Sequence, residues 1–279
     1  AREAGLVAAE ARALGGIGDA HYARLDLKRA LDAFAACVSL AAEHELETIA
    51  SAHRPMAAIS RFYVEAGVAP LEDAAVAAEQ ARVAGSLRNE ILAVIGLGVI
   101  QAFAADRDGV DGTIKRLAKL IGETESRFRA DYTIGCMFAS WLSGRAPEAF
   151  AAAEAYLAEH DEPYLAPAIA GIAAISAQEE APARAAIDQG QRILERGVVA
   201  HSFLMFHHFA MRAAVRWGWR RPALDLADSL AARIDLEDCT FARLAHAQTL
   251  TALEGTEADR AAVSDEIAAA RLGLFLFEA

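Results

Sequence analysis

Apolar and polar residues follow one another along this chain at the spacing of amphipathic helices, and alanine, leucine, isoleucine and valine dominate the apolar positions. Proline precedes four alanine-rich helical stretches: Pro70, Pro147, Pro182 and Pro222. Asp108–Gly109 stands where a further start is expected. Proline is tolerated at the first helical position because its φ is already helical and its missing N–H is not needed there. A start signal that recurs every 35–40 residues predicts one helical unit, copied and stacked.

Seven helix pairs account for the whole chain. First helices are predicted at 5–23, 48–66, 88–105, 125–143, 163–178, 200–218 and 239–254. Second helices are predicted at 27–43, 70–84, 110–122, 147–159, 182–196, 222–234 and 257–271. The predicted fold class is therefore all-α, an α-solenoid wound as a right-handed superhelix, in one repeat domain over residues 1–279.

The first unit carries a repeat signature. Large, large, glycine, alanine, aromatic and small residues stand at the positions where a tetratricopeptide repeat has them: Leu14, Ile17, Gly18, Ala30, Phe34 and Cys37. Small residues at Gly18 and Ala30 allow the two helices of a unit to approach closely, and Phe34 fills the gap to the next unit. The matching small residues of later units are Ala74, Ala149 and Ala223.

Composition narrows the possible partners. The net charge of −12 and the pI near 5.1 disfavour nucleic acid and anionic lipid, since both would be repelled. Three widely spaced cysteines, without a CxxC pair, indicate apolar filler in a reducing compartment. No signal peptide is visible and the apolar stretches are shorter than the roughly 20 residues of a membrane span, so we expect a cytoplasmic location.

Both ends of the chain carry information. There is no initiator methionine and a helical pattern already runs through residues 1–13, which predicts a fragment of a longer polypeptide or a leader that is not included. The final apolar residues are Leu274, Phe275, Leu276 and Phe277. Because a stable array normally ends in a polar cap, this tail is expected to fold back on the last unit or to meet something else.

Motifs for catalysis or cofactor binding are weak. Gly96-x-Gly98 follows an apolar run, but Gln101 replaces the third glycine of a dinucleotide fingerprint, so we interpret the glycines as helix contacts. His201 and His208 are seven residues apart without an intervening carboxylate, whereas a helical metal pair needs a spacing of three or four. We therefore predict no metal, no cofactor and no catalytic residue in this segment.

The concave groove is the stronger candidate for function. First helices line that face in such arrays, and the repeat register directs these polar residues toward it: Arg12, Asp19, Arg54, Arg61, Arg129, Tyr132, His208 and Arg212. Arginines within an acidic chain suit an acidic peptide or a carboxylate ligand. Ordinary solvated or internally paired charges are the alternative.

Three stretches resemble one known family: "ALGGIGDAHYA" at 13–23, "ACVSLAAEHEL" at 36–46 and "SFLMFHHFAMRAA" at 202–214. They are similar to the C-terminal tetratricopeptide region of large bacterial class III adenylate cyclases, and the resemblance extends over residues 8–235. In that family a cyclase domain and a signalling ATPase domain precede the array. The resemblance thus implies a regulatory region of an enzyme that makes cyclic AMP, while the family's catalytic aspartates and P-loop match nothing here.

The function expected from the sequence is recognition of a protein, a peptide or a small effector in the groove, or of other domains of the parent chain. Two alternatives keep the array: a sensor region of a signalling-ATPase transcription activator, and a free-standing adaptor. A third alternative, an enzyme acting in a helical cleft, would need an acid–base or metal constellation that the sequence does not reveal.

Overall fold

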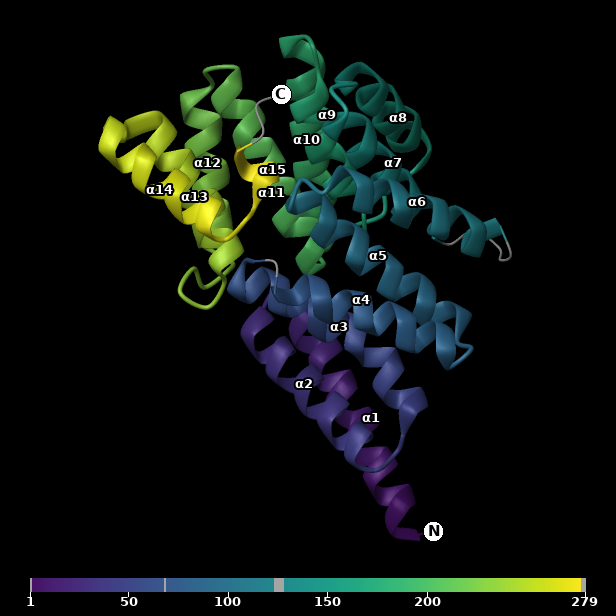
Figure 1. The fold of residues 1–279 in the computed structure, drawn as a ribbon. Coiled ribbons are helices and arrows are strands. Elements are labelled where there is room, and N and C mark those ends of the chain that lie inside the picture. Colours follow the sequence, from purple (N-terminus) through teal and green to yellow (C-terminus); the bar gives the residue numbers. More distant parts are fainter. Residues whose placement is uncertain (1, 68, 123–127, 277–279) are drawn as a thin grey trace.

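The computed structural model describes residues 2–67, 69–122 and 128–276, with side chains from residue 5 onward except those of 129 and 130. The described residues form helices joined by short loops, without a strand among them (Figure 1). In chain order the helices are α1 (Arg2–Ala23), α2 (Leu27–Glu43), α3 (Glu47–Glu65), α4 (Ala69–Val83), α5 (Leu87–Phe103), α6 (Arg107–Gly122), α7 (Arg129–Leu142), α8 (Ala146–Glu159), α9 (Ala166–Ser176), α10 (Glu180–Arg196), α11 (Ala200–Arg216), α12 (Arg220–Ala231), α13 (Thr240–Glu254), α14 (Glu257–Ala269) and α15 (Gly273–Leu276).

The all-α prediction is confirmed, and each of the fourteen predicted helices is present with its ends within four residues of the expected positions. Only α15 was not predicted as a helix. No helix in the described part of the chain is both long and apolar enough to span a membrane.

The turns between the helices explain why the helix ends could be predicted from the sequence. Gly85, Gly144 and Gly218 follow α4, α7 and α11 with φ values of 68°, 75° and 70°, a backbone conformation that glycine adopts without strain. Leu25 and Glu45 adopt the same left-handed conformation after α1 and α2 without being glycine. Similar tight turns therefore return the chain on itself at many of the helix junctions.

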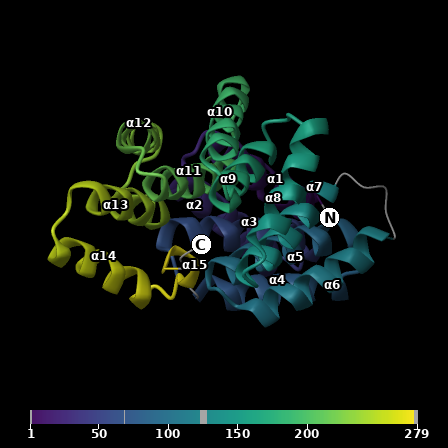
Figure 2. The same cartoon turned by 90° about the horizontal axis from the view of Figure 1, so that it is seen from above.

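Helices are arranged in two layers. Each helix packs against the next in sequence, and each odd-numbered helix from α1 to α13 also contacts the next odd-numbered helix. Seen from above, α10, α12 and α14 lie at the periphery around α9 and α11 (Figure 2). All eleven residues of α9 are buried, whereas Ile267 is the single residue of α14 that is buried. Odd-numbered helices thus form the inner layer.

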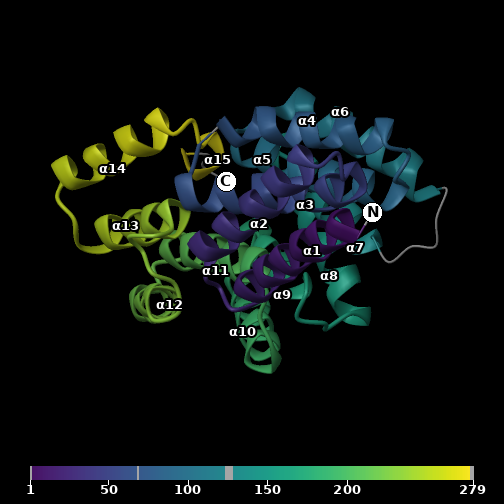
Figure 3. The same ribbon diagram turned by 90° about the horizontal axis from the view of Figure 1, so that it is seen from below.

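The inner layer closes on itself. Helix α13 contacts α3, so α3, α5, α7, α9, α11 and α13 form a closed circuit of packed helices. Cys239 Sγ, just before α13, donates to the carbonyl of Tyr63 at 3.4 Å. Tyr22 and His201 are 3.2 Å apart, from the hydroxyl of one to Nδ1 of the other, which joins α1 to α11 (Figure 3).

Close approach within the first unit depends on residue size. A Cβ placed on Gly18 would lie 2.6 Å from the ring of Phe34, so only glycine fits at this contact. The Phe34 ring stacks on His53 of the next unit, with ring centroids 6.0 Å apart. Of the other residues that the repeat signature singles out, Ala30, Cys37, Ala74, Ala149 and Ala223 are buried, Leu14 is half-buried and Ile17 is 48% exposed.

Rings fill one end of the space within the inner layer. We call the following set the aromatic cluster: Phe62, Tyr63, Phe103, Phe138, Trp141, His208, Phe209, Phe241 and Phe275. Phe275 belongs to the C-terminal segment, which therefore folds back into the core. Arg212 Nη1 donates to the Leu274 carbonyl at 2.6 Å, and Gln248 Nε2 donates to the Phe275 carbonyl at 2.8 Å. Phe277 lies outside the described residues.

Candidate ligand cavity

A cavity of about 480 Å³ occupies the other end of the space within the inner layer. Its walls come from α1, α3, α5, α6, α7 and α11 and from the loop before α9. Along α5 and α11 the residues that line the cavity come before those of the aromatic cluster in the sequence, whereas Tyr63 of α3 and Phe138 of α7 belong to both sets. One enclosed space is therefore filled by rings at one end and hollow at the other, and the hollow has the size of a typical small-molecule site.

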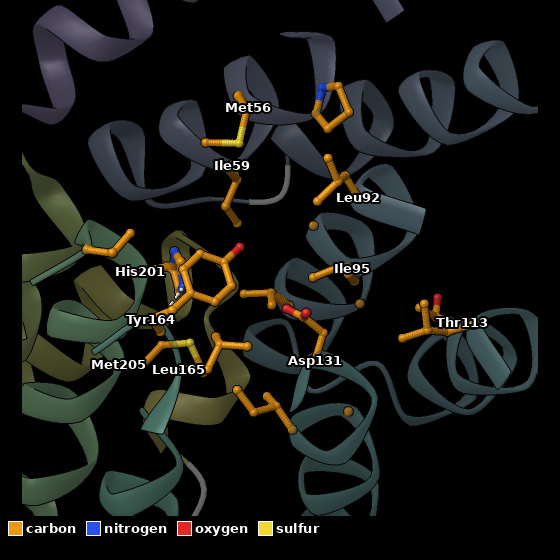
Figure 4. Close-up of a pocket in the computed structure, with 18 of the residues that line it drawn as sticks. Met56, Ile59, Leu92, Ile95, Thr113, Asp131, Tyr164, Leu165, His201 and Met205 are labelled. Atoms are coloured by element: carbon orange, nitrogen blue, oxygen red, sulfur yellow. Dashed lines mark hydrogen bonds between the residues drawn. The ribbon is translucent and has the colours of Figure 1, made fainter. Parts of the chain in front are cut away.

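Aliphatic and thioether side chains make up most of the wall. Six of them face the space in Figure 4: Met56, Ile59, Leu92, Ile95, Leu165 and Met205. Gly96, Gly98 and Gly135 also line it. A Cβ on Gly98 would lie 2.8 Å from the Thr113 side chain and one on Gly135 would lie 3.3 Å from Ile114, so these two glycines let α5 and α7 approach α6 closely. The largely aliphatic wall favours an apolar ligand.

A hydrogen-bonded group fixes one side of the cavity. His201 Nε2 lies 3.0 Å from the Tyr164 carbonyl, and His201 Nδ1 lies 3.2 Å from the Tyr22 hydroxyl. A carbonyl oxygen only accepts, so Nε2 carries the proton and Nδ1 accepts from the tyrosine hydroxyl. Burial lowers the pKa of His201 to about 4, so the ring is neutral at pH 7 and both its nitrogens are engaged.

Asp131 is the buried carboxyl of the site. It lies in the first turn of α7 with 9% of its surface exposed, and its carboxyl group points into the cavity (Figure 4). Burial raises its pKa to about 7, against the opposing effect of a hydrogen bond from its own backbone N–H. A carboxyl that titrates near neutral pH inside a cavity marks a functional site on physical grounds.

Charged groups gather at the rim. Asp19 and His53 face each other there, and burial raises the pKa of the first and lowers the pKa of the second. Arg88 is exposed, and its charge favours ionisation of both Asp19 and Tyr164. Among the described residues that line the cavity, Arg88 and Asp19 thus place a cation and a carboxyl at the mouth, and Asp131 is the acidic side chain of the interior.

Of the eight residues predicted to face a groove, the structure places Asp19 in the cavity wall. Arg54 pairs with Glu47 at 2.5 Å, and Arg61 pairs with Glu65 at 2.8 Å and Asp73 at 2.7 Å. Both arginines are therefore paired with carboxylates of this chain.

The remaining predicted residues are dispersed. Arg12 is exposed on α1, and Tyr132 is half-buried against the small core around Ile91. His208 and Arg212 belong to the filled end, where Arg212 also lies over the Trp141 ring at 5.6 Å. Arg129 begins α7, and its side chain lies outside the described part.

Sequence reasoning missed the central residues of the site, Asp131, Tyr164 and His201. In the sequence, Asp131 lies between Arg129 and Tyr132, two residues that we predicted to face the groove. This position was the signal that could have pointed to Asp131. Its burial depends on the approach of α11 and the loop before α9, which no local pattern reveals.

Metal-type clusters are a separate question. Within the described ranges, no three His, Cys, Asp or Glu side chains are grouped as metal ligands would be. His207 bonds the Phe203 carbonyl at 2.8 Å and the Ser229 hydroxyl at 3.2 Å, so its ring serves the packing of α11 on α12.

Comparisons of this chain with models of known families, with curated proteins and with solved structures each found no match.

Proposed function

We propose that the chain is a non-catalytic binding and regulatory module, an α-solenoid of seven tetratricopeptide-like helix pairs wound as a tight right-handed superhelix. Its enclosed space holds a small, largely apolar effector. The cavity is the observation that carries this proposal, because it combines an apolar wall, about 480 Å³ of volume and few inward polar groups.

A small effector fits the site better than a long peptide does. The aromatic cluster and α15 fill the far end of the enclosed space, where Phe275 contacts Phe103 and Phe241. An extended peptide running through the array would have to displace this segment. A compact ligand needs no such displacement.

A regulatory role follows from the number of helix pairs that contribute residues to the cavity wall. Helices α1, α3, α5, α7 and α11 belong to different helix pairs, and all of them contribute residues to one cavity. A ligand that contacts them together stabilises the arrangement in which they surround it, and so biases the array as a whole. The resemblance to the cyclase family supports a parent enzyme whose cyclic AMP production responds to this change.

Asp131 also favours a second candidate function, acid–base catalysis, because its pKa lies near the pH at which such groups work best. A catalytic site would need a further group able to exchange a proton. His201, the nearest candidate on α11, has both nitrogens engaged. Binding without reaction is therefore the function that the geometry supports best.

A neutral dye tests the cavity directly. N-phenyl-1-naphthylamine, which fluoresces strongly in apolar surroundings, is expected to bind the full chain saturably. Ile95→Trp places a large ring in the cavity and is expected to weaken binding at least about tenfold. Val76→Trp, on the exposed side of α4, is the matched control and should bind as the wild type does.

Two results would contradict the proposal: absence of saturable binding to the wild type, or unchanged binding to a folded Ile95→Trp variant. Recovery of a chemically altered probe would favour the catalytic candidate instead. The regulatory part is tested by deleting residues 1–279 from the parent cyclase. Unchanged cyclic AMP production with and without the ligand would overturn it.

A further inference from the structure

The ligand class follows from a carboxyl group that has no partner. Asp131 is 9% exposed and its carboxyl points into the cavity, on the side where the Tyr164 ring lies (Figure 4). No ion pair or hydrogen bond links this carboxyl to any other residue that the structure describes; its hydrogen bond comes from its own backbone N–H. A buried carboxylate is costly without a compensating charge, so its position indicates that the compensation comes from a ligand.

Other polar groups of the wall do not supply that compensation. Both nitrogens of His201 are used, and the ring is neutral at pH 7. Burial likewise lowers the pKa of His53, whose nearby charge is Asp19. Arg88 is exposed at the rim. The Tyr63 hydroxyl is buried and has no hydrogen-bond partner among the described residues, so it is a second polar group of the wall that can bond a ligand.

We propose that the cavity binds an organic cation, an amine carried on an apolar body, with the ammonium group paired to the Asp131 carboxylate. This inference rests on the proposed function, because it assigns the chemistry of the same site. The ammonium supplies the missing charge and donates hydrogen bonds, while the aliphatic wall buries the rest of the ligand.

Competing ligand charges are disfavoured by the same geometry. A carboxylate drawn in by Arg88 would bring a second negative charge toward Asp131, and like charges in an apolar site repel strongly. A neutral alcohol would bury its chain equally well but would leave Asp131 protonated or uncompensated. The order of affinity should therefore be ammonium, then alcohol, then carboxylate.

Three probes with one eight-carbon chain separate these cases: octylamine, octanol and octanoate. Each is titrated against the full chain at pH 8 by displacement of N-phenyl-1-naphthylamine and by calorimetry. Octylamine is ionised at this pH, since alkyl ammonium groups titrate near about 10. We expect octylamine to bind at least about tenfold more tightly than octanol, and octanoate to bind most weakly.

Asp131→Asn removes the charge and keeps the size of the side chain. We expect this variant to lose the preference for octylamine, with the ratio of the two affinities close to one and octanol binding unchanged within about threefold. Asp111→Asn makes the same change on the exposed side of α6 and controls for the net charge of the chain. It should keep the wild-type ratio.

The outcomes distinguish this inference from the proposed function. Equal affinities for octylamine and octanol, or a preference for octanoate, would overturn the amine assignment and leave an apolar cavity that binds neutral ligands. An octylamine preference that survives in Asp131→Asn would overturn it as well, since the cation would then bind elsewhere. Failure of the neutral dye and of all three probes would remove the proposed function itself.

Discussion

The two ends of the space within the inner helices differ although the same helices build both. At one end Phe103, Phe138 and Phe209 reach across and meet. At the other end, α5 and α7 present aliphatic side chains such as Leu92, Ile95 and Ile134, and the rings of Tyr63 and Phe138 border the hollow without filling it. The cavity is therefore a result of side-chain size at particular positions. A closed circuit of packed helices can hold a ligand site wherever its inward side chains are too small to meet.

The largest expected effect comes from opening the filled end. Phe103→Ala removes a fully buried ring that contacts Phe62, Phe138 and Phe241. We expect a loss of about 3–5 kcal/mol in the free energy of unfolding, measured in urea. Leu92→Ala, on the same helix but beside the cavity, should cost at least about 2 kcal/mol less because it borders a space that is already empty. Equal losses would mean that the two ends are packed alike.

The next effect concerns the charge at the hollow end. Burial raises the pKa of folded Asp131 to about 7, above its usual value of 3.8. Between these two pH values the carboxyl is ionised in the unfolded chain and still protonated in the folded chain. The free energy of unfolding therefore falls as the pH rises from about 4 to about 7. Asp131→Asn should thus be more stable than the wild type by about 2–4 kcal/mol at pH 8 and nearly equal to it at pH 4.

Urea unfolding of both proteins at a series of pH values measures this difference. Burial lowers the pKa of His201 and His207 to about 4, so both destabilise the fold in acid, but they are present in both proteins and cancel. A stability difference that does not change with pH would show that Asp131 does not titrate near neutrality.

A smaller effect is expected from the polar member of the aromatic cluster. Both nitrogens of His208 are buried and have no hydrogen-bond partner in the part of the chain that the structure describes. Burial together with the nearby Arg212 charge holds the pKa of this ring well below 6.5. His208→Leu removes two unsatisfied groups and should raise the free energy of unfolding by about 1–3 kcal/mol at pH 7. His246→Leu, at a half-buried position on α13, is the comparison, and an equal gain there would remove the argument.

The smallest expected effect concerns the segment that completes the filled end. Arg212→Met removes the hydrogen bond from Nη1 to the Leu274 carbonyl. We expect a loss of about 0.5–1.5 kcal/mol and faster amide hydrogen exchange in α15, read by mass spectrometry. Dye binding at the hollow end should stay unchanged, and a parallel loss there would show that the two ends are coupled.

Sequence alone was sufficient for the helices and insufficient for the cavity. Helix pairs were predictable because alanine-rich amphipathic stretches and turn residues such as Gly144 and Gly218 are local signals. The closed circuit of inner helices was not predictable, because the contact between α13 and α3 joins two segments that lie far apart in the sequence. Asp131 was overlooked for the same reason: a carboxylate in a first helical turn normally faces solvent.

Groove residues were predicted from register alone, and register does not report what a side chain meets. Arg61 was expected to face a ligand, but Asp73 on the neighbouring helix supplies its partner. Asp19 came to lie in the cavity wall near His53 of α3 and Arg88 of α5, neighbours that the pattern of α1 alone does not reveal. What surrounds each of these side chains depends on tertiary packing.

Closure of the inner layer also bears on how the protein unfolds. An open stack of helix pairs, in which each pair touches only its neighbours, can fray from its ends one pair at a time. Here the hydrogen bond from Cys239 to Tyr63 spans 176 residues, and the contact of Tyr22 with His201 spans 179. Unfolding of the helices at either end of the chain would therefore also break contacts with helices that are far away in the sequence. We therefore expect one cooperative thermal transition, with equal calorimetric and van't Hoff enthalpies, where an open stack of helices would melt gradually.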